Sequence, residues 1–118
     1  MIETTILDAD GIACFKVVGP LYLPEILAVI KKVYPSVKHG VVWDFSESDP
    51  SQVTKHDMML AAQSVATYAK HRKTAAVGSA DLQFGLLRMY EAYAEIERVS
   101  PIMRVFRNTD DALDWLRE

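Results

Sequence analysis

The sequence has few of the features that mark secreted, membrane or nucleic-acid-binding proteins. One cysteine among 118 residues offers no internal disulfide, so we expect a reduced thiol in a cytoplasmic protein. The formal net charge of −3 argues against nucleic-acid binding, which needs a basic surface to neutralise phosphates. No apolar run approaches the roughly 20 residues of a membrane span, and the start, MIETTILDADG, does not resemble a signal peptide. We therefore expect neither a membrane span nor a nucleic-acid partner.

Catalytic and metal-binding motifs are also missing. The sequence contains no Gly-x-Ser-x-Gly elbow, no Walker loop and no Gly-x-Gly-x-x-Gly turn. His39, His56 and His71 lie far apart, and no two have the spacing of ligands on one helical turn. None lies near Cys14, which we interpret as a small structural residue of a β-rich run. We expect a non-enzymatic protein without a metal or a cofactor.

Asp44 has a position typical of an active site, because it ends an apolar run. A receiver domain carries its phosphoacceptor aspartate at such a place, but it needs a helix between its first two strands and a lysine after its last. This sequence has a tight Asp-Gly turn and Arg107-Asn108 instead. An aspartyl-phosphate hydrolase needs a second carboxylate two residues later, where Ser46 stands. The sequence therefore assigns Asp44 no catalytic role.

Short β-rich runs alternate with helical patterns along the chain. Residues 8–11, Asp-Ala-Asp-Gly, separate the first two runs and are typical of a tight hairpin turn. Strands that then alternate with helices predict a mostly parallel sheet with one antiparallel edge. We expect a single α/β domain over residues 1–118, with a five-stranded mixed sheet, an opening β-hairpin and four helices. The predicted strands are 2–7, 12–18, 38–45, 74–77 and 102–107, and the predicted helices are 24–34, 54–71, 80–97 and 109 onward.

Two local signals mark where helices begin. Thr54-x-x-Asp57 has the outline of a capping box, with Asp in place of the usual Glu or Gln. Asn108 or Thr109 is placed to cap the last helix. The apolar positions of the expected elements predict a core that comprises Phe15, Val17, Ile26, Ile30, Val41, Val42, Val65, Val77, Leu86, Met89, Val105 and Leu113.

Three stretches carry a resemblance to a known family: VVWDFSES from residue 41, FGLLRMYEAYAE from residue 84, and VFRNTDDALDWL from residue 105. They resemble the STAS domain, named for sulfate transporters and anti-sigma-factor antagonists, and within it the SpoIIAA-like branch of small bacterial proteins. In the order of its elements the chain resembles this family over nearly its whole length. The resemblance implies a STAS-like fold and a regulatory module with a protein partner.

In the sporulation regulators of that family, the functional place is the loop after the third strand. A serine there is phosphorylated within an Asp-Ser-Ser-Gly-like motif, which this sequence lacks. Its own stretch, DFSESDPSQVTKHD, supplies hydroxyls without the glycine. The alternative is that these side chains bond to the backbone where the chain leaves a buried strand. The candidate regulatory loop after Asp44 comprises Asp44, Ser46, Ser48, Ser51 and Thr54.

The helices predicted at 54–71 and 80–97 are more apolar than a surface helix needs. The second has a stripe at helical spacing through Leu82 and Met89, and part of another on a neighbouring face. This excess predicts either a filled core or a partner surface. We expect a homodimer, which Leu87→Glu should split. The residues expected at an interface or a ligand cleft are Met58, Met59, Phe84, Leu87, Tyr90 and Tyr93.

The leading hypothesis is thus a non-enzymatic regulatory or protein-interaction module of STAS-like type. The alternative is a protein that binds a lipid or another small apolar ligand, because SpoIIAA-like proteins also resemble the lipid-carrying Sec14 fold. Aromatic and methionine side chains on the helices could line such a cleft. An apolar cavity on the order of a few hundred cubic ångströms would favour the alternative.

Overall fold

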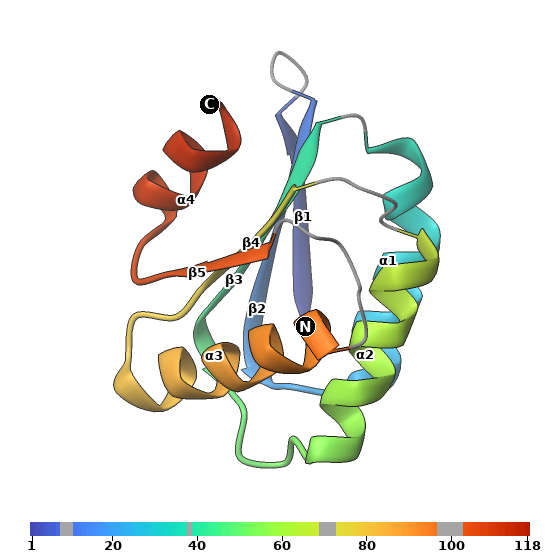
Figure 1. Cartoon of the computed structure of the whole chain (residues 1–118), viewed down its shortest axis with the longest axis vertical. Helices are drawn as coiled ribbons and strands as arrows, with labels where there is room; N and C mark the ends of the chain where they lie inside the picture. The colour runs from blue at the N-terminus through green and yellow to red at the C-terminus, as the bar shows by residue number, and fades with distance from the viewer. Residues whose placement is uncertain (8–10, 38, 69–72, 97–102) are drawn as a thin grey trace.

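The computed structural model of the chain describes residues 1–7, 11–37, 39–68, 73–96 and 103–118. Over these residues it contains a five-stranded sheet with the strand order β1-β2-β3-β4-β5 (Figure 1). The strands are β1 (Ile2–Leu7), β2 (Ile12–Pro20), β3 (Gly40–Asp49), β4 (Lys73–Val77) and β5 (Met103–Phe106). The helices are α1 (Leu23–Val33), α2 (Lys55–Tyr68), α3 (Asp81–Ile96) and α4 (Thr109–Leu116), with a short 3-10 helix, η1 (Tyr34–Ser36), after α1.

The chain opens with the predicted antiparallel pair. β1 and β2 pair with Ile2 opposite Val17 and Thr4 opposite Phe15. Gly11, at the end of the turn, has a φ of 66°, a left-handed conformation that glycine adopts without steric cost. Residues 8–10 of the turn lie outside the described part of the chain. The expected hairpin and the antiparallel edge are both confirmed.

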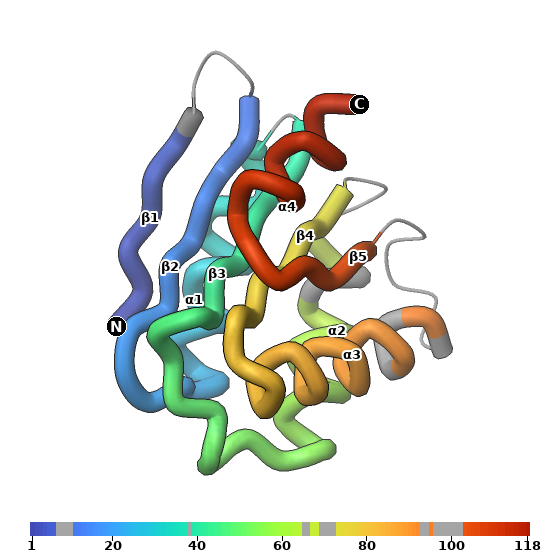
Figure 2. Tube along the Cα trace, turned by 90° about the vertical axis from the view of Figure 1, so that its left-hand side faces the viewer, coloured from blue at the N-terminus to red at the C-terminus, as the bar shows by residue number. Residues whose placement is uncertain are grey.

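The remaining strands pair in parallel, each with the strand before it in the chain. Parallel strands need a helical crossover, and such crossovers are right-handed. Because each new strand is added at the same edge of the sheet, right-handed crossovers place their successive helices on the same face. Figures 1 and 2 show α1 and α2 on the side of the sheet opposite α4. The predicted mixed α/β fold is confirmed.

Alternating residues of the central strands divide between two cores. Phe15 of β2 and Trp43 of β3 face the α1–α3 side, where their ring centroids lie 4.5 Å apart. Tyr34 closes this core, and its hydroxyl accepts a 2.6 Å hydrogen bond from the Trp43 indole nitrogen. On the other face, Val42 and its neighbours pack against α4, through Ala112, Trp115 and Leu116.

Most of the predicted core is buried or half-buried, with one error. Phe15, Val17, Ile30, Val41, Val42 and Val77 are buried, and Ile26, Leu86, Val105 and Leu113 are half-buried. The side chain of Val65 lies outside the described residues. Met89 is 41% exposed, so its assignment to the core was wrong. It lies two residues after the buried Leu87, about 200° around the helix, and therefore points away from the sheet.

β3 is longer than the predicted strand. It continues past residue 45 to Asp49, because β2 also continues and pairs Gly19 with Ser48 and Pro20 with Asp49. The register shifts between Lys16 and Val18, which marks a bulge in this pair. The stretch after Asp44, expected to be a loop, is therefore strand as far as Asp49.

Candidate functional site

Asp44 is a structural residue of the β3 bulge. It lies in register between Lys16 of β2 and Val77 of β4, and Val77 belongs to the core on the α4 side. Its Oδ1 accepts a 2.9 Å hydrogen bond from the backbone N–H of Ser46. A carboxylate that bonds the backbone two residues later is an ordinary device where a strand bends. The geometry thus agrees with the structural alternative for Asp44.

Two of the predicted regulatory hydroxyls lie within the strand. Ser48 is buried, and its hydroxyl donates to the backbone oxygen of Phe45 at 2.7 Å. Ser46 is half-buried. The buried amide of Gln83, from α3, donates to the backbone oxygens of Ser46 and Ser48 at 3.1 and 3.0 Å. The end of β3 is thereby fastened to the first turn of α3, which leaves the Ser48 hydroxyl little access to a modifying enzyme.

Ser51 and Thr54 are the exposed hydroxyls of the set, and each lies beside a carboxylate. The Ser51 N–H donates to Asp49 Oδ1 at 3.0 Å, and hydrogen bonds from Ser51 hold the pKa of Asp49 below its usual range. Thr54 and Asp57 form the predicted capping box. The Asp57 N–H donates to Thr54 Oγ1 and the Thr54 N–H donates to Asp57 Oδ2, both at 3.1 Å.

A pocket lies between the sheet and helices α1, α2 and α3. Its volume is about 100 Å³, and its lining is almost entirely apolar. Among the predicted cleft residues, Met58, Leu87 and Tyr90 line it, whereas Met59 and Phe84 do not. The side chain of Tyr93 lies outside the described residues. Met58 and Leu87 are buried, so they contribute to the pocket wall rather than to a surface contact.

The pocket lining contains two tyrosines and one buried hydroxyl without a hydrogen-bond partner among the described residues. Burial raises the pKa of the Tyr34 and Tyr90 phenols above the usual range for tyrosine, so both stay protonated at neutral pH. Thr74, on β4, is 4% exposed, and its Oγ1 has no hydrogen-bond partner among the described residues. Sequence reasoning missed Thr74 and Gln83. The available signal was a single hydroxyl in the apolar strand and an amide on the inward face of α3.

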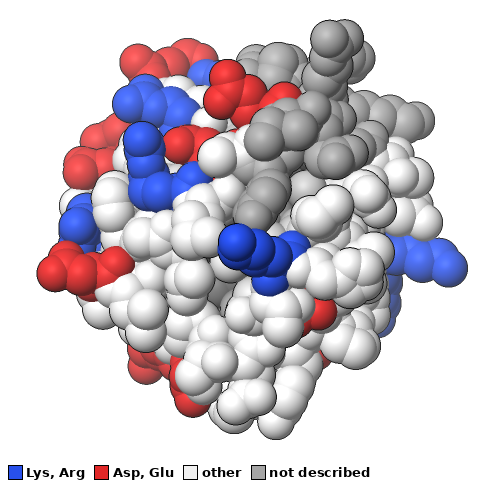
Figure 3. Space-filling model, turned by 60° about the horizontal axis from the view of Figure 1, so that its bottom comes forward, with Lys and Arg blue, Asp and Glu red and all other residues white. Residues whose placement is uncertain are grey.

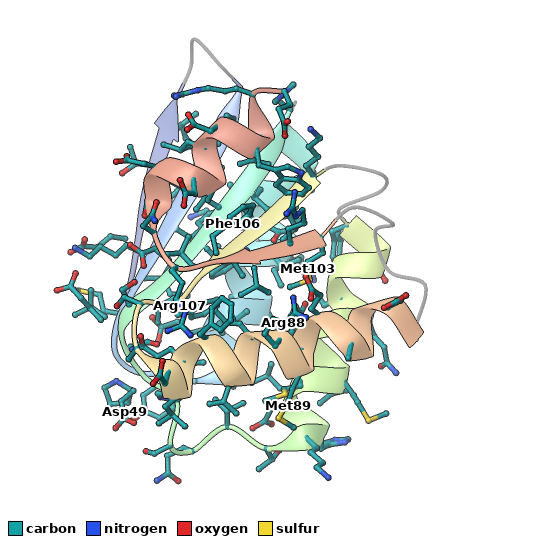
Figure 4. All side chains as sticks on the ribbon, turned by 60° about the vertical axis from the view of Figure 1, so that its left-hand side comes forward. Asp49, Arg88, Met89, Met103, Phe106 and Arg107 are labelled. Carbon is teal, nitrogen blue, oxygen red and sulfur yellow. The ribbon has the colours of Figure 1, made fainter. Side chains whose placement is uncertain are left out.

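Outside the pocket, α2 and α3 expose apolar side chains. Leu82 is 63% exposed and Met89 41% on α3, and Met59 is 37% exposed on α2. Figure 4 shows Met89 on the side of α3 that faces away from β5. Phe84 is half-buried under the Arg107 guanidinium, whose carbon lies 4.0 Å from the ring centroid. We call Met59, Leu82 and Met89 the α2–α3 surface.

The described residues offer neither a metal-binding cluster nor a helix that could span a membrane. No three histidine, cysteine, aspartate or glutamate side chains lie close enough together there to bind a metal ion. None of the described helices combines the length and the apolar composition that crossing a bilayer requires.

Comparison with known proteins identifies the fold. No protein-family model and no curated protein matches the chain. A solved structure, an anti-sigma factor antagonist from Mycobacterium paratuberculosis, is similar over 100% of this chain and 96% of its own, with a TM-score of 0.70 and 18% sequence identity. The fold is that of an anti-sigma factor antagonist. The STAS-like, SpoIIAA-like fold expected from the sequence is therefore confirmed.

Proposed function

We propose that this protein is a non-enzymatic regulatory module that binds a protein partner. The support is the anti-sigma factor antagonist fold together with the α2–α3 surface. An antagonist of that kind acts on another protein, and a regulatory module needs a surface of its own for such a contact. We also propose a cytoplasmic location, because the lone Cys14 is half-buried and its burial raises the pKa of its thiol, which suits a reduced, unreactive residue.

The α2–α3 surface has the composition of a partner contact. Its members are methionine and leucine, on two helices that pack against each other (Figures 1 and 2). Methionine side chains adapt to differently shaped partners. Figure 3, which views the end of the molecule with the β3–α2 connection, shows a broad area of uncharged residues. The proposed contact is therefore mainly apolar, and charge plays a minor part in holding the partner.

The β3–α2 connection offers a means of control. Ser51 and Thr54 are exposed there, and the backbone N–H of each donates to a carboxylate, that of Asp49 and that of Asp57 respectively. A phosphate on Ser51 would repel Asp49, and one on Thr54 would repel Asp57. Either modification would open the turn or the capping box at the start of α2. We propose that phosphorylation, where it occurs, acts on the partner contact by loosening this connection.

A single charge on the α2–α3 surface tests the proposal. Met89→Glu places a carboxylate in an apolar contact without touching the core, because the side chain points outward. It should weaken partner binding at least tenfold, since a buried unpaired charge costs more than 1.4 kcal/mol (about a tenfold change). The measurement is quantitative capture of a defined protein from an extract of the native host.

Ala28→Glu is the matched control, because Ala28 is an exposed helical position on α1. It should leave capture unchanged. Equal capture by Met89→Glu and the wild type would exclude the α2–α3 surface as the contact. Ser51→Glu, measured alongside, tests the switch: unchanged capture would remove Ser51 from it and leave the interaction itself in place.

The pocket favours a second candidate function, the binding of a small apolar ligand. Pockets for drug-sized molecules occupy about 300–1,000 Å³, whereas this one is about 100 Å³. That volume suits one small ring and is too small for the acyl chains of a lipid. Native mass spectrometry of freshly purified protein tests this candidate. A bound mass of ring size supports it, and so does a shift in melting temperature with a small aromatic compound.

A further inference from the structure

We infer that the pocket binds a neutral ligand of single-ring size with one hydrogen-bonding group, and that Thr74 Oγ1 holds this group. The inference rests on the second candidate function and names its ligand class and its anchoring residue. It does not depend on the partner contact at the α2–α3 surface, because Thr74 belongs to the pocket lining.

The size and the apolar walls of the pocket determine how large and how apolar the ligand must be. Its volume is about 100 Å³, and Ile30, Trp43, Met58 and Leu87 are among the side chains that line it. Apolar protein cavities on the order of 150 Å³ stay dry and bind benzene. A space of this size and character therefore suits a six-membered ring better than a cluster of water molecules, which would find few polar partners there.

The unpartnered hydroxyl of Thr74 requires that the ligand carry a hydrogen-bonding group. On β4 it lies in register between Val41 and Met103, so its neighbours along the sheet are apolar. Its hydroxyl is buried and has no partner among the described residues. A buried hydroxyl without a hydrogen bond is unfavourable, and valine would fill nearly the same space without that cost. Threonine at this position is accounted for if a bound molecule completes the hydrogen bond.

Three other polar side chains of the lining already have partners. Ser48 bonds to the backbone of Phe45, Gln83 to the end of β3, and Asp57 to the backbone of Thr54. Thr74 Oγ1 is the buried atom that lacks a partner among the described residues, and its hydroxyl can both donate to and accept from the polar group of a ligand.

The charges of the pocket lining require that the ligand carry no negative charge. No lysine, arginine or histidine is among the described residues that line the pocket, whereas the Asp57 carboxyl is. A carboxylate or phosphate ligand would lose its hydration without gaining a cation. The ligand class is therefore a neutral ring with a hydroxyl group, of which phenol is the simplest member.

Phenol and benzene form a matched pair of probes, because they differ by the one hydroxyl. We expect the wild type to bind phenol about tenfold more tightly than benzene, as one added hydrogen bond in a buried site provides. Thr74→Val keeps the shape of the side chain and removes the hydroxyl. It should abolish the preference for phenol and leave benzene binding unchanged. Titrations followed by protein NMR chemical shifts measure all four affinities.

The outcomes separate the inference from the function on which it rests. If neither probe binds the wild type, the second candidate function and the inference about Thr74 both fail. If both bind with equal affinity, or if Thr74→Val keeps the preference, the pocket binds ligands but Thr74 does not anchor them. Ala61→Leu, which fills the pocket from α2, should abolish binding of both probes, whereas Ala28→Leu on the exposed face of α1 should not. Should Thr74→Val fail to fold, Thr74→Ser must keep the preference and Thr74→Ala must lose it.

Discussion

At the scale of single residues, Tyr34 connects packing with hydrogen bonding in the main core. Its ring stacks on Phe15 with centroids 6.1 Å apart, and its hydroxyl satisfies the indole N–H of Trp43. Two large polar aromatics can thus be buried together without leaving the indole donor unpaired. The same burial raises the pKa of the Tyr34 phenol far above its usual range, which makes stability depend on pH.

The sign of that dependence follows from proton linkage. Above about pH 10, tyrosine in the unfolded chain loses its proton, whereas Tyr34 in the folded protein keeps it. The folded state then binds more protons than the unfolded state, so the free energy of unfolding falls as pH rises further. We expect a lower urea midpoint at pH 11 than at pH 9, both values being about one unit from the tyrosine pKa.

Tyr34→Phe provides the control for this prediction. It should be less stable than the wild type throughout, because the Trp43 N–H loses its acceptor. Its midpoint should nevertheless fall less between the two pH values, since one of the two phenols whose pKa burial raises, Tyr34 and Tyr90, is gone. An equal fall in both proteins would mean that other groups cause the alkaline loss of stability.

At the scale of elements, the start of α2 depends on one local motif. Thr54→Ala removes the hydroxyl that accepts the Asp57 N–H, and it should lower the free energy of unfolding by about 1 kcal/mol. Ser51→Ala is the matched control, because Ser51 is also exposed but caps no helix, and its effect should stay within about 0.5 kcal/mol. Urea denaturation measures both. Similar losses in the two variants would show that the cap contributes no special stability.

The start of α2 depends on local hydrogen bonds and the end of β3 on distant ones, and this difference explains which features could be predicted from the sequence. The capping box and the opening hairpin were predictable, because their hydrogen bonds join residues close together in the chain. The true end of β3 was not, since it depends on pairing with Gly19 and Pro20 and on the Gln83 amide from α3. The candidate regulatory loop was consequently drawn too long. Thr74 escaped notice for the same reason, because only the assembled sheet and helices reveal that its hydroxyl has no partner.

At the scale of the whole molecule, α3 divides the interior from the proposed contact surface. Leu87 is 8% exposed and lines the pocket, whereas Met89, two residues later, points outward. Leu87→Glu was expected from the sequence to split a dimer. The burial of Leu87 changes that expectation, because a carboxylate there would lie in an apolar interior.

We therefore predict opposite results for two charges on one helix. Leu87→Glu should unfold the domain or lower its stability by about 3 kcal/mol or more, the range for a charge placed in a core. Met89→Glu should keep the fold, and if the homodimer exists it should sediment as a monomer. Circular dichroism and sedimentation velocity measure the two properties. A folded, monomeric Leu87→Glu beside a dimeric wild type would return Leu87 to the interface.

The order of the strands also bears on how the chain folds during synthesis. Each strand hydrogen-bonds to the one before it, so the sheet order repeats the order of translation. A chain that emerges N-terminus first can add every new β-α unit to an edge that already exists, without waiting for a distant segment. Pairing between chain neighbours also means that each parallel pair closes a chain segment that holds only one crossover helix. Until β5 arrives, however, the edge of β4 stays open, and β5 then replaces it with an edge strand of only four residues, which offers less backbone for intermolecular pairing.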